Sequence, residues 1–141
     1  MPEIARTTVS LRIVGDALDP DEITGLLGVE PTGCARKGDT RTTASGRNVM
    51  ARSGSWLLKA DAFGDLEAQI TALLSKLPDD PAIWVDLSRR YGCDIFCGLF
   101  MREFNEGTEL QPQVLSMLGN RRLCLSLDIY GCFDGEVSTS D

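Results

Sequence analysis

Alternating apolar and polar residues mark a segment near each end of the chain. Residues 7–14 place three apolar side chains on one face, and residues 121–131 place four on one face. A period of two is typical of a strand with one buried side. Both segments are therefore predicted to be strands of a sheet whose other face is polar. The side chains expected to face the core are Val9, Leu11, Ile13, Leu123, Leu125, Leu127 and Ile129.

Two further strands are predicted between these ends. Residues 55–60 read SWLLKA, which has strand composition. Residues 93–102 read CDIFCGLFMR and carry apolar side chains on both faces. A strand that is apolar on both faces is typical of the centre of a sheet. The sequence thus predicts about four strands.

Residues 19–28 are predicted to form a short helix. Asp19 suits the N-cap, Pro20 suits the first helical position, and Glu22 completes the pattern of a capping box. Gly28 can end the helix in the left-handed conformation.

Three more helices are expected at residues 65–77, 81–91 and 112–119. The second is ambiguous, because its AIWV stretch has strand composition. Asp80 and Pro81 suit an N-cap and a first helical turn, so we favour a helix there. In the last helix, the side chains expected to point inward are Val114, Leu115 and Leu118.

These elements predict an α+β protein built as a two-layer sandwich. A mixed sheet of about four strands would carry the helices on one face. We expect one globular domain over residues 1–131, since a chain of 141 residues has the length of a single domain. The acidic tail at residues 132–141 is expected to be frayed.

One segment departs from the rest in both pattern and charge. Residues 31–54 show almost no apolar periodicity and are rich in Gly, Ser and Thr, which predicts a long loop with a short strand near residues 48–51. Residues 31–56 hold five basic residues and one acidic residue, a charge of +4, whereas the whole chain carries −7. The remainder therefore carries −11. Loops this long inside compact domains are usually functional or disordered.

Composition excludes several kinds of catalytic and metal site. The chain has no histidine, which removes Ser-His-Asp and Cys-His arrangements and histidine metal sites. Its five cysteines are odd in number and contain no CxxC pair, so we expect free thiols. We expect no cofactor and no metal.

Charge and hydropathy indicate where the protein is located and which partners suit it. The first fifteen residues lack a basic start followed by an apolar stretch, so we expect no signal peptide and a cytoplasmic protein. No apolar run approaches the length of a membrane helix. The acidic balance argues against nucleic acid and suits a partner protein with a basic surface.

Several blocks of the sequence resemble a bacterial family. The most specific is DPDEITGLLGVEPTGCARKGD at residues 19–39, and SGSWLLKA at 53–60 and GNRRLCLSLDIYG at 119–131 add to it. Over most of its length the chain resembles the domain-of-unknown-function family 4279. The resemblance implies a compact α+β domain and brings no activity with it.

The basic segment offers the best candidates for a binding site. Arg36 would supply a bidentate fork, Lys37 a point charge, and Asp39 a carboxylate that orients one of the two. Trp56 closes the segment and could show its ring edge to a ligand, although packing in the core or at its rim is the plainer interpretation. Asp128 points away from the core face and could pair with Arg12 or with the basic segment.

We expect residues 36–52 to form a mobile loop over the polar side of the sheet, near Asp128. If Arg36 and Lys37 contact a partner, their loss weakens binding and leaves stability unchanged. If instead they pin the loop to the body, their loss lowers stability.

The leading functional hypothesis is a non-catalytic binding or protein-interaction module, such as an immunity-like or accessory protein. The alternative is a domain that binds a small anion or phosphate ligand through the basic segment. An enzyme of unrecognised type falls under this alternative. The segment lacks both the Walker and the dinucleotide glycine patterns. A third class is a redox-sensing cysteine protein.

Overall fold

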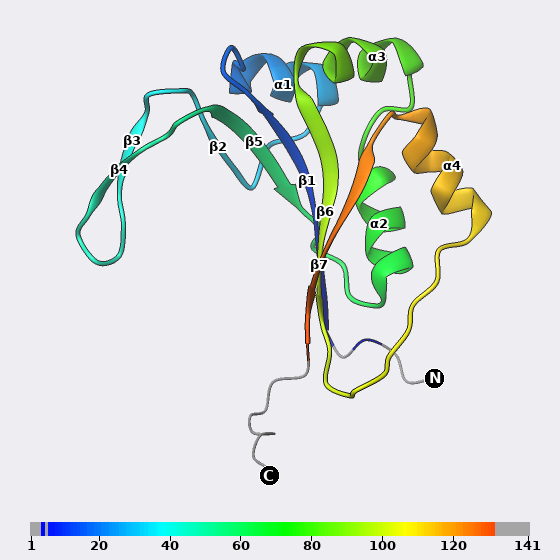
Figure 1. Ribbon diagram of the computed structural model, residues 1–141. Coiled ribbons are helices and arrows are strands. Elements are labelled where there is room, and N and C mark those ends of the chain that lie inside the picture. The colour runs from blue at the N-terminus through cyan, green and yellow to red at the C-terminus, as the bar shows by residue number, and fades with distance from the viewer. Residues whose placement is uncertain (1–3, 5, 132–141) are drawn as a thin grey trace.

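The computed structural model describes residue 4 and residues 6–131. Its main sheet has five strands in the order β2-β5-β1-β6-β7, and β3 and β4 form a separate two-stranded ribbon (Figure 1). The strands are β1 (Arg6–Gly15), β2 (Gly33–Ala35), β3 (Thr40–Thr42), β4 (Asn48–Met50), β5 (Gly54–Lys59), β6 (Gly92–Phe100) and β7 (Cys124–Tyr130). The helices are α1 (Pro20–Leu27), α2 (Leu66–Leu74), α3 (Pro81–Arg90) and α4 (Pro112–Asn120).

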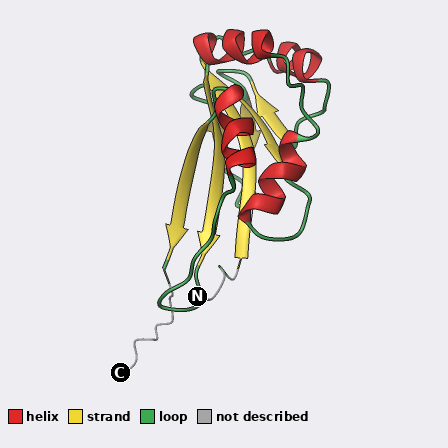
Figure 2. Ribbon diagram, turned by 90° about the vertical axis from the view of Figure 1, so that its right-hand side faces the viewer, coloured by secondary structure: helices red, strands yellow, loops and turns green. Residues whose placement is uncertain are grey.

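The predicted fold class is confirmed, with five strands in the sheet rather than four. β1 runs antiparallel to β5 and β6, β2 runs antiparallel to β5, and β6 and β7 are parallel, so the sheet is mixed. The helices lie on one side of it: α2 and α4 run along the sheet, while α1 and α3 lie at one end (Figure 2). No helix of the described residues lies on the opposite face of the sheet.

The core lies between the sheet and its helices. Alternation along β1 buries Val9, Leu11 and Ile13, as the sequence predicts. These side chains meet the apolar stripes of the helices, and apolar burial of this kind is the main favourable term in folding. The central side chains buried to within 1 % of complete are Leu11, Ile13, Ile23, Trp56, Ile70, Leu73, Leu74, Trp84, Leu87, Ile95 and Cys97.

The start and end of α1 follow local chemistry. Asp19 caps the helix by accepting the backbone N–H of Asp21 at 3.0 Å, and Gly28 ends it at φ 75°. The predicted capping box is wrong, because the Glu22 carboxylate binds the Arg90 side chain at 2.9 and 3.0 Å. The ambiguous segment that follows Asp80 is helix α3, with Asp80 as its N-cap.

The last strand is less buried than its alternation predicts. Leu127 and Ile129 of β7 are 47 % and 56 % exposed, and Leu115 of α4 is 51 % exposed. β7 is an edge strand, and its end extends beyond the helices (Figure 1). Leu127 and Ile129 lie in register with buried residues of β6 and so face the helix side of the sheet, but too little lies above them to bury them. The prediction that Leu115 points inward is wrong, because the buried side chains of α4 are Val114 and Leu118.

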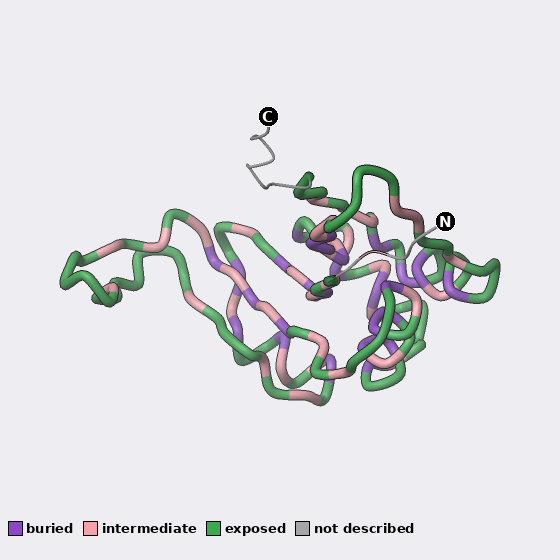
Figure 3. The backbone as a smooth tube through the Cα atoms, turned by 90° about the horizontal axis from the view of Figure 1, so that it is seen from below, coloured by how far each residue is buried: buried purple, intermediate pink, exposed green. Residues whose placement is uncertain are grey.

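The predicted long loop at residues 31–54 is wrong in part, because three short strands, β2, β3 and β4, interrupt it. β2 is the fifth strand of the sheet and pairs with β5 at one edge. β3 and β4 form an antiparallel ribbon that projects away from the body (Figures 1 and 3). The short strand predicted near residues 48–51 is confirmed as β4.

A three-residue turn closes the tip of the ribbon. The N–H of Gly46 donates to the Thr43 carbonyl at 2.9 Å, and the N–H of Thr43 donates to the Arg47 carbonyl at 2.7 Å. Gly46 has φ 86°, the left-handed conformation that such hairpin turns require. The tail at residues 132–141, for which fraying is predicted, lies outside the described residues.

Candidate functional site

Residues 36–39 form the turn that leads from β2 into the ribbon. The N–H of Asp39 donates to the Arg36 carbonyl at 3.0 Å, and the N–H of Arg36 donates to the Asp39 carboxylate at 2.9 Å. Gly38 has φ 92°, which favours glycine at the third position of a turn. Asp39 therefore holds the backbone of this turn, which differs from its predicted role of orienting a cation.

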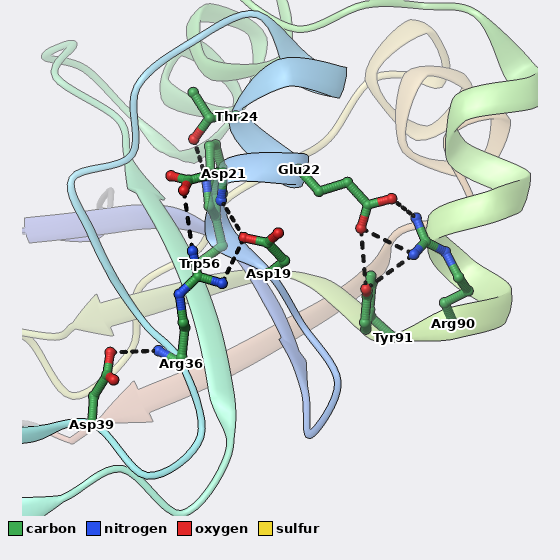
Figure 4. Close-up of polar contacts among 9 residues, drawn as sticks. All are labelled: Asp19, Asp21, Glu22, Thr24, Arg36, Asp39, Trp56, Arg90 and Tyr91. Carbon is green, nitrogen blue, oxygen red and sulfur yellow. Dashed lines mark hydrogen bonds and ion pairs between the residues drawn. The ribbon is translucent and has the colours of Figure 1, made fainter.

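Both cations of this turn are paired with carboxylates of the β1–α1 region, and Figure 4 shows the pairs of Arg36. The Arg36 guanidinium contacts Asp19 at 2.8 Å and Asp21 at 3.1 Å, and the Lys37 ammonium contacts Asp16 at 3.2 Å. These contacts attach the base of the ribbon to the N-terminus of α1. Arg36 and Lys37 thus pin the segment to the body, although not through Asp128.

The same contacts lower the pKa of two of the carboxylates. The pKa of Asp16 lies below its ordinary value because the Ser53 hydroxyl donates to it, and Lys37 adds to the effect. The pKa of Asp19 is lowered by the backbone N–H of Asp21, and Arg36 adds to that effect. Both acids are therefore charged at neutral pH, as the ion pairs require.

Three more arginines of the basic segment are exposed: Arg41 and Arg47 in the ribbon, and Arg52 between the ribbon and β5. Within the described part of the chain, none of their side chains makes a hydrogen bond or an ion pair. Arg41 is opposed to Val49 in the ribbon, and opposed residues share a face. Arg47 lies just before β4 and is opposed to Thr43, whose N–H donates to its carbonyl at 2.7 Å, so it shares the face of Arg41, two residues before Thr43. The ribbon therefore presents two unpaired guanidinium groups together.

Trp56 is not available to a ligand. Its side chain is fully buried, and its indole N–H donates to the Thr24 hydroxyl of α1 at 3.1 Å (Figure 4). It joins β5 to α1 in the core, which is the plainer of the two sequence interpretations.

Asp128 lies far from the ribbon in the order of strands. β2, which leads into the ribbon, and β7, which carries Asp128, are the two edges of the sheet. The expectation that residues 36–52 lie near Asp128 is therefore wrong. Asp128 accepts the Tyr130 hydroxyl at 2.6 Å, and this hydrogen bond raises the pKa of Tyr130.

The partner of Arg12 is Asp94, not Asp128. The two residues are directly opposed on β1 and β6, and the guanidinium donates two hydrogen bonds to the carboxylate, at 2.9 and 2.6 Å. Ser126 of β7 donates a third, at 2.7 Å, and the guanidinium lies 4.1 Å above the Phe96 ring. The open face of the sheet thus carries a polar cluster that spans three strands.

The surroundings of Asp94 act on its pKa in two directions. Burial would raise it, but the hydrogen bonds from Arg12 and Ser126 outweigh burial, so the pKa lies below its ordinary value. A charged Asp94 in turn fixes the orientation of the Arg12 guanidinium. The sequence places Arg12 on the polar face, but it does not give the register that brings Asp94 opposite.

A second cluster joins α1 to α3 (Figure 4). Arg90 binds both oxygens of Glu22 and also contacts Asp86 at 2.9 Å. The Tyr91 hydroxyl donates to Glu22 at 3.4 Å, and burial is the largest cause of a raised pKa for Tyr91. We assign this cluster a structural role, because each charged group in it faces an opposite charge.

The four described cysteines are free thiols. Burial raises the pKa of Cys93 to about 11 and that of Cys97 to about 12, and the charge of Asp94 adds to both shifts. Such thiols are poor nucleophiles near neutral pH. Cys34 and Cys124 are exposed, and Cys132 lies outside the described residues.

Two kinds of feature are absent from the described residues. They contain no group of three or more Cys, Asp or Glu side chains placed to hold a metal ion. Nor do they include a helix with the length and apolar character needed to cross a membrane.

Comparison with known proteins gives one match. The family model described as a domain of unknown function (DUF4279) matches residues 5–132. No curated protein and no solved structure matches the chain.

Proposed function

The chain belongs to the domain-of-unknown-function family 4279, whose description assigns no activity, so we propose a function from the geometry. We propose that the protein is a non-catalytic interaction module. Its β3–β4 ribbon docks onto an acidic surface of a partner protein. The observation that carries the proposal is the pair of unpaired guanidinium groups, Arg41 and Arg47, on one face of a projecting ribbon.

The division of the basic segment supports this function. Arg36 and Lys37 attach the base of the ribbon to the body, so the ribbon is held in place before a partner arrives. A preorganised surface loses less conformational freedom on binding than a free loop does. Arg41 and Arg47 can then bind a carboxylate of the partner without first breaking an ion pair within this protein.

The charge of the whole chain favours a protein partner over nucleic acid. The ribbon and its flanks carry +4, and the remainder carries −11. A nucleic acid is charged all along its backbone and would be repelled by the body wherever it extended past the ribbon. A protein can instead present a local acidic patch to the ribbon, and a basic patch would suit the acidic body.

The alternative of a phosphate ligand held by Arg36 and Lys37 is less well supported. Both cations already contact carboxylates of the β1–α1 region, so an anion there would have to displace them. A non-catalytic module fits an immunity-like or accessory protein. We also propose a cytoplasmic location, because the exposed and unpaired thiols of Cys34 and Cys124 suit a reducing compartment.

A photo-crosslinker at the tip of the ribbon tests the proposal. Ala44 is exposed in the turn and can be replaced by a benzophenone-bearing residue without loss of a buried contact. In an extract of the host cell, the protein should give discrete protein adducts whose crosslinked surfaces are acidic. Replacing Arg41 and Arg47 by Gln should abolish these adducts, since opposite charges drive the contact.

The matched control replaces Arg89 and Arg122 by Gln. Both are exposed, and both lie outside the ribbon, so this variant loses the same charge elsewhere. It should keep the adducts. Three outcomes would contradict the proposed function: the adducts persist in the ribbon variant, they are lost equally in the control, or they consist of nucleic acid.

A further inference from the structure

The open face of the sheet contains a hollow that is separate from the ribbon. It encloses about 700 Å³ and lies where β5 ends beside β1. The β1–β5 pairing ends at Ser10 and Lys59, so the stretch of β1 before Val9 has no strand neighbour on that side. The chain leaving β5 forms the opposite wall. A volume of this size falls in the range of small-molecule sites.

The wall of the hollow is held by a buried side chain. The Gln69 amide, 6 % exposed, donates to the carbonyls of Thr7 and Gly64, each at 2.9 Å. The N–H of Ala60 donates to the Val9 carbonyl at 2.9 Å. These bonds fix the loop after β5 against β1, so the hollow is built into the fold.

Positive charge gathers along the hollow. Arg6, Arg12 and Lys59 line it, and none of the described residues that line it is acidic. In a chain with 21 acidic and 14 basic residues, a wall with three cations and no carboxylate is unexpected. Within the described structure, neither Arg6 nor Lys59 has a carboxylate partner. Both cations can therefore meet an external anion.

Two of the cations and a hydroxyl lie on the open face of neighbouring strands at one end of the hollow. Ser10 and Lys59 are directly opposed on β1 and β5, and Arg12 is the next residue on the same face of β1. Diagonal neighbours on a sheet lie roughly 7–8 Å apart, within reach of long side chains. Asp94 fixes Arg12 through its Nε and Nη2 atoms, and neither bond uses Nη1. The three groups form a cradle for one anionic group.

Aromatic side chains flank this cradle. Phe96 is opposed to Ser10 on β6 and lines the hollow beneath the Arg12 guanidinium. Phe63, on the loop after β5, lines the other side and is 96 % exposed. An exposed aromatic ring beside cations suits a planar ligand that carries a negative charge.

We infer that this hollow binds a small aromatic anion, either a carboxylate or a phosphate monoester. Lys59, Arg12 and Ser10 hold the anionic group, and the planar body lies against the exposed ring of Phe63. The site is independent of the ribbon, because it lies on the other side of β5 from β2 and uses none of the ribbon's arginines.

Titration of the ¹⁵N-labelled protein with phenyl phosphate, observed by NMR, tests the inference. Saturable shifts are expected at the backbone amides of Thr8, Ser10 and Lys59. Benzoate should shift the same amides, and the neutral benzyl alcohol should bind at least about tenfold more weakly, because one charge-assisted hydrogen bond accounts for about that factor.

Two exposed residues allow variants that keep the fold. Lys59→Gln should weaken phenyl phosphate about tenfold, whereas Arg89→Gln, which removes one exposed cation from α3, should leave its affinity unchanged. Phe63→Ser should weaken phenyl phosphate but not inorganic phosphate, because only the first has a ring to place there.

The inference is overturned if millimolar phenyl phosphate gives no saturable shift, if Lys59→Gln and Arg89→Gln weaken binding equally, or if the shifts are centred on the ribbon amides. Equal affinity for benzyl alcohol would overturn it too, since a neutral ligand has no use for the cradle.

Discussion

Asp94 accepts hydrogen bonds from two side chains on neighbouring strands, Arg12 on β1 and Ser126 on β7. Its side chain is 17 % exposed and that of Arg12 is 41 % exposed, so solvent screens the pair only in part. A carboxylate in such a setting contributes to stability mainly while it is charged.

Replacing Asp94 by Asn should destabilise the protein in a pH-dependent way. The pKa of Asp94 in the folded state is below 3.8, the value of an unperturbed aspartate. The stabilisation from the Asp94 charge is therefore fully present above pH 3.8, and it is lost as the pH falls through the pKa of the folded state. Urea unfolding at neutral pH should show a loss of about 1–2 kcal/mol, a figure that allows for the exposure of Arg12.

The same comparison repeated near pH 3 should give a smaller difference between the two proteins. Protonation removes the charge of the natural carboxylate in this range, whereas the amide of the variant is uncharged at every pH. A difference in the free energy of unfolding that stays constant across this range would show that the Asp94 charge adds nothing.

At the scale of elements, the contact between β5 and the β1–α1 connection leaves no room for a side chain at Gly54. A Cβ atom there would lie 2.7 Å from the Gly15 carbonyl oxygen and 2.9 Å from the Leu18 Cβ. Gly54→Ala should therefore lower the free energy of unfolding by about 2 kcal/mol, as overpacking of a buried site does. Urea unfolding measures the change.

Gly33→Ala on β2 is the matched control for this substitution. A Cβ at Gly33 meets nothing within 4 Å, and its backbone is not left-handed. Its effect should stay within about 0.5 kcal/mol, as for other open surface sites. If the two variants were equally stable, the close approach of β5 to the β1–α1 connection would not be a packing constraint.

Elements specified by local chemistry are the ones that the sequence predicts. The helix α1 follows from Asp19, Pro20 and Gly28, which act within their own turns. β7 follows from alternation, but the exposure of Leu127 and Ile129 depends on what lies above an edge strand. Alternation reports which side chains share a face, and it carries no information about how much of that face is covered.

The ribbon shows a different limit of prediction. Its strands bury no face and so show no apolar period, and of the two only β4 is predicted from the sequence. Their signal lies in the turn, where Gly46 takes a left-handed conformation, and such turns are hard to distinguish from any loop rich in Gly and Ser.

Prediction of the candidate sites is limited in the same way. Arg36 and Lys37 are visible in the sequence as unusual charges, but their partners come from the β1–α1 region. Arg12 and Asp94 are 82 positions apart, and only the register of β1 and β6 opposes them. Residue types can be read from the chain, whereas pairing across the sheet requires the fold.

On the scale of the whole molecule, the cations of the basic segment fall into two groups. Arg36 and Lys37 anchor the ribbon to the body, and Arg41 and Arg47 remain free for a partner. Anchored and free cations differ in what their loss does to the ribbon itself. Amide hydrogen exchange reports this, because it measures local opening residue by residue.

The most direct test compares two double variants by amide hydrogen exchange of the ribbon. The reporters are the N–H groups of Gly38 and Ala51, which donate to backbone carbonyls at the base of the ribbon at 2.9 and 2.7 Å. Replacing Arg36 and Lys37 by Gln should speed their exchange by about threefold, since exposed ion pairs contribute modestly. Replacing Arg41 and Arg47 by Gln should leave it unchanged. Equal exchange in both variants, or faster exchange in the second alone, would contradict the division.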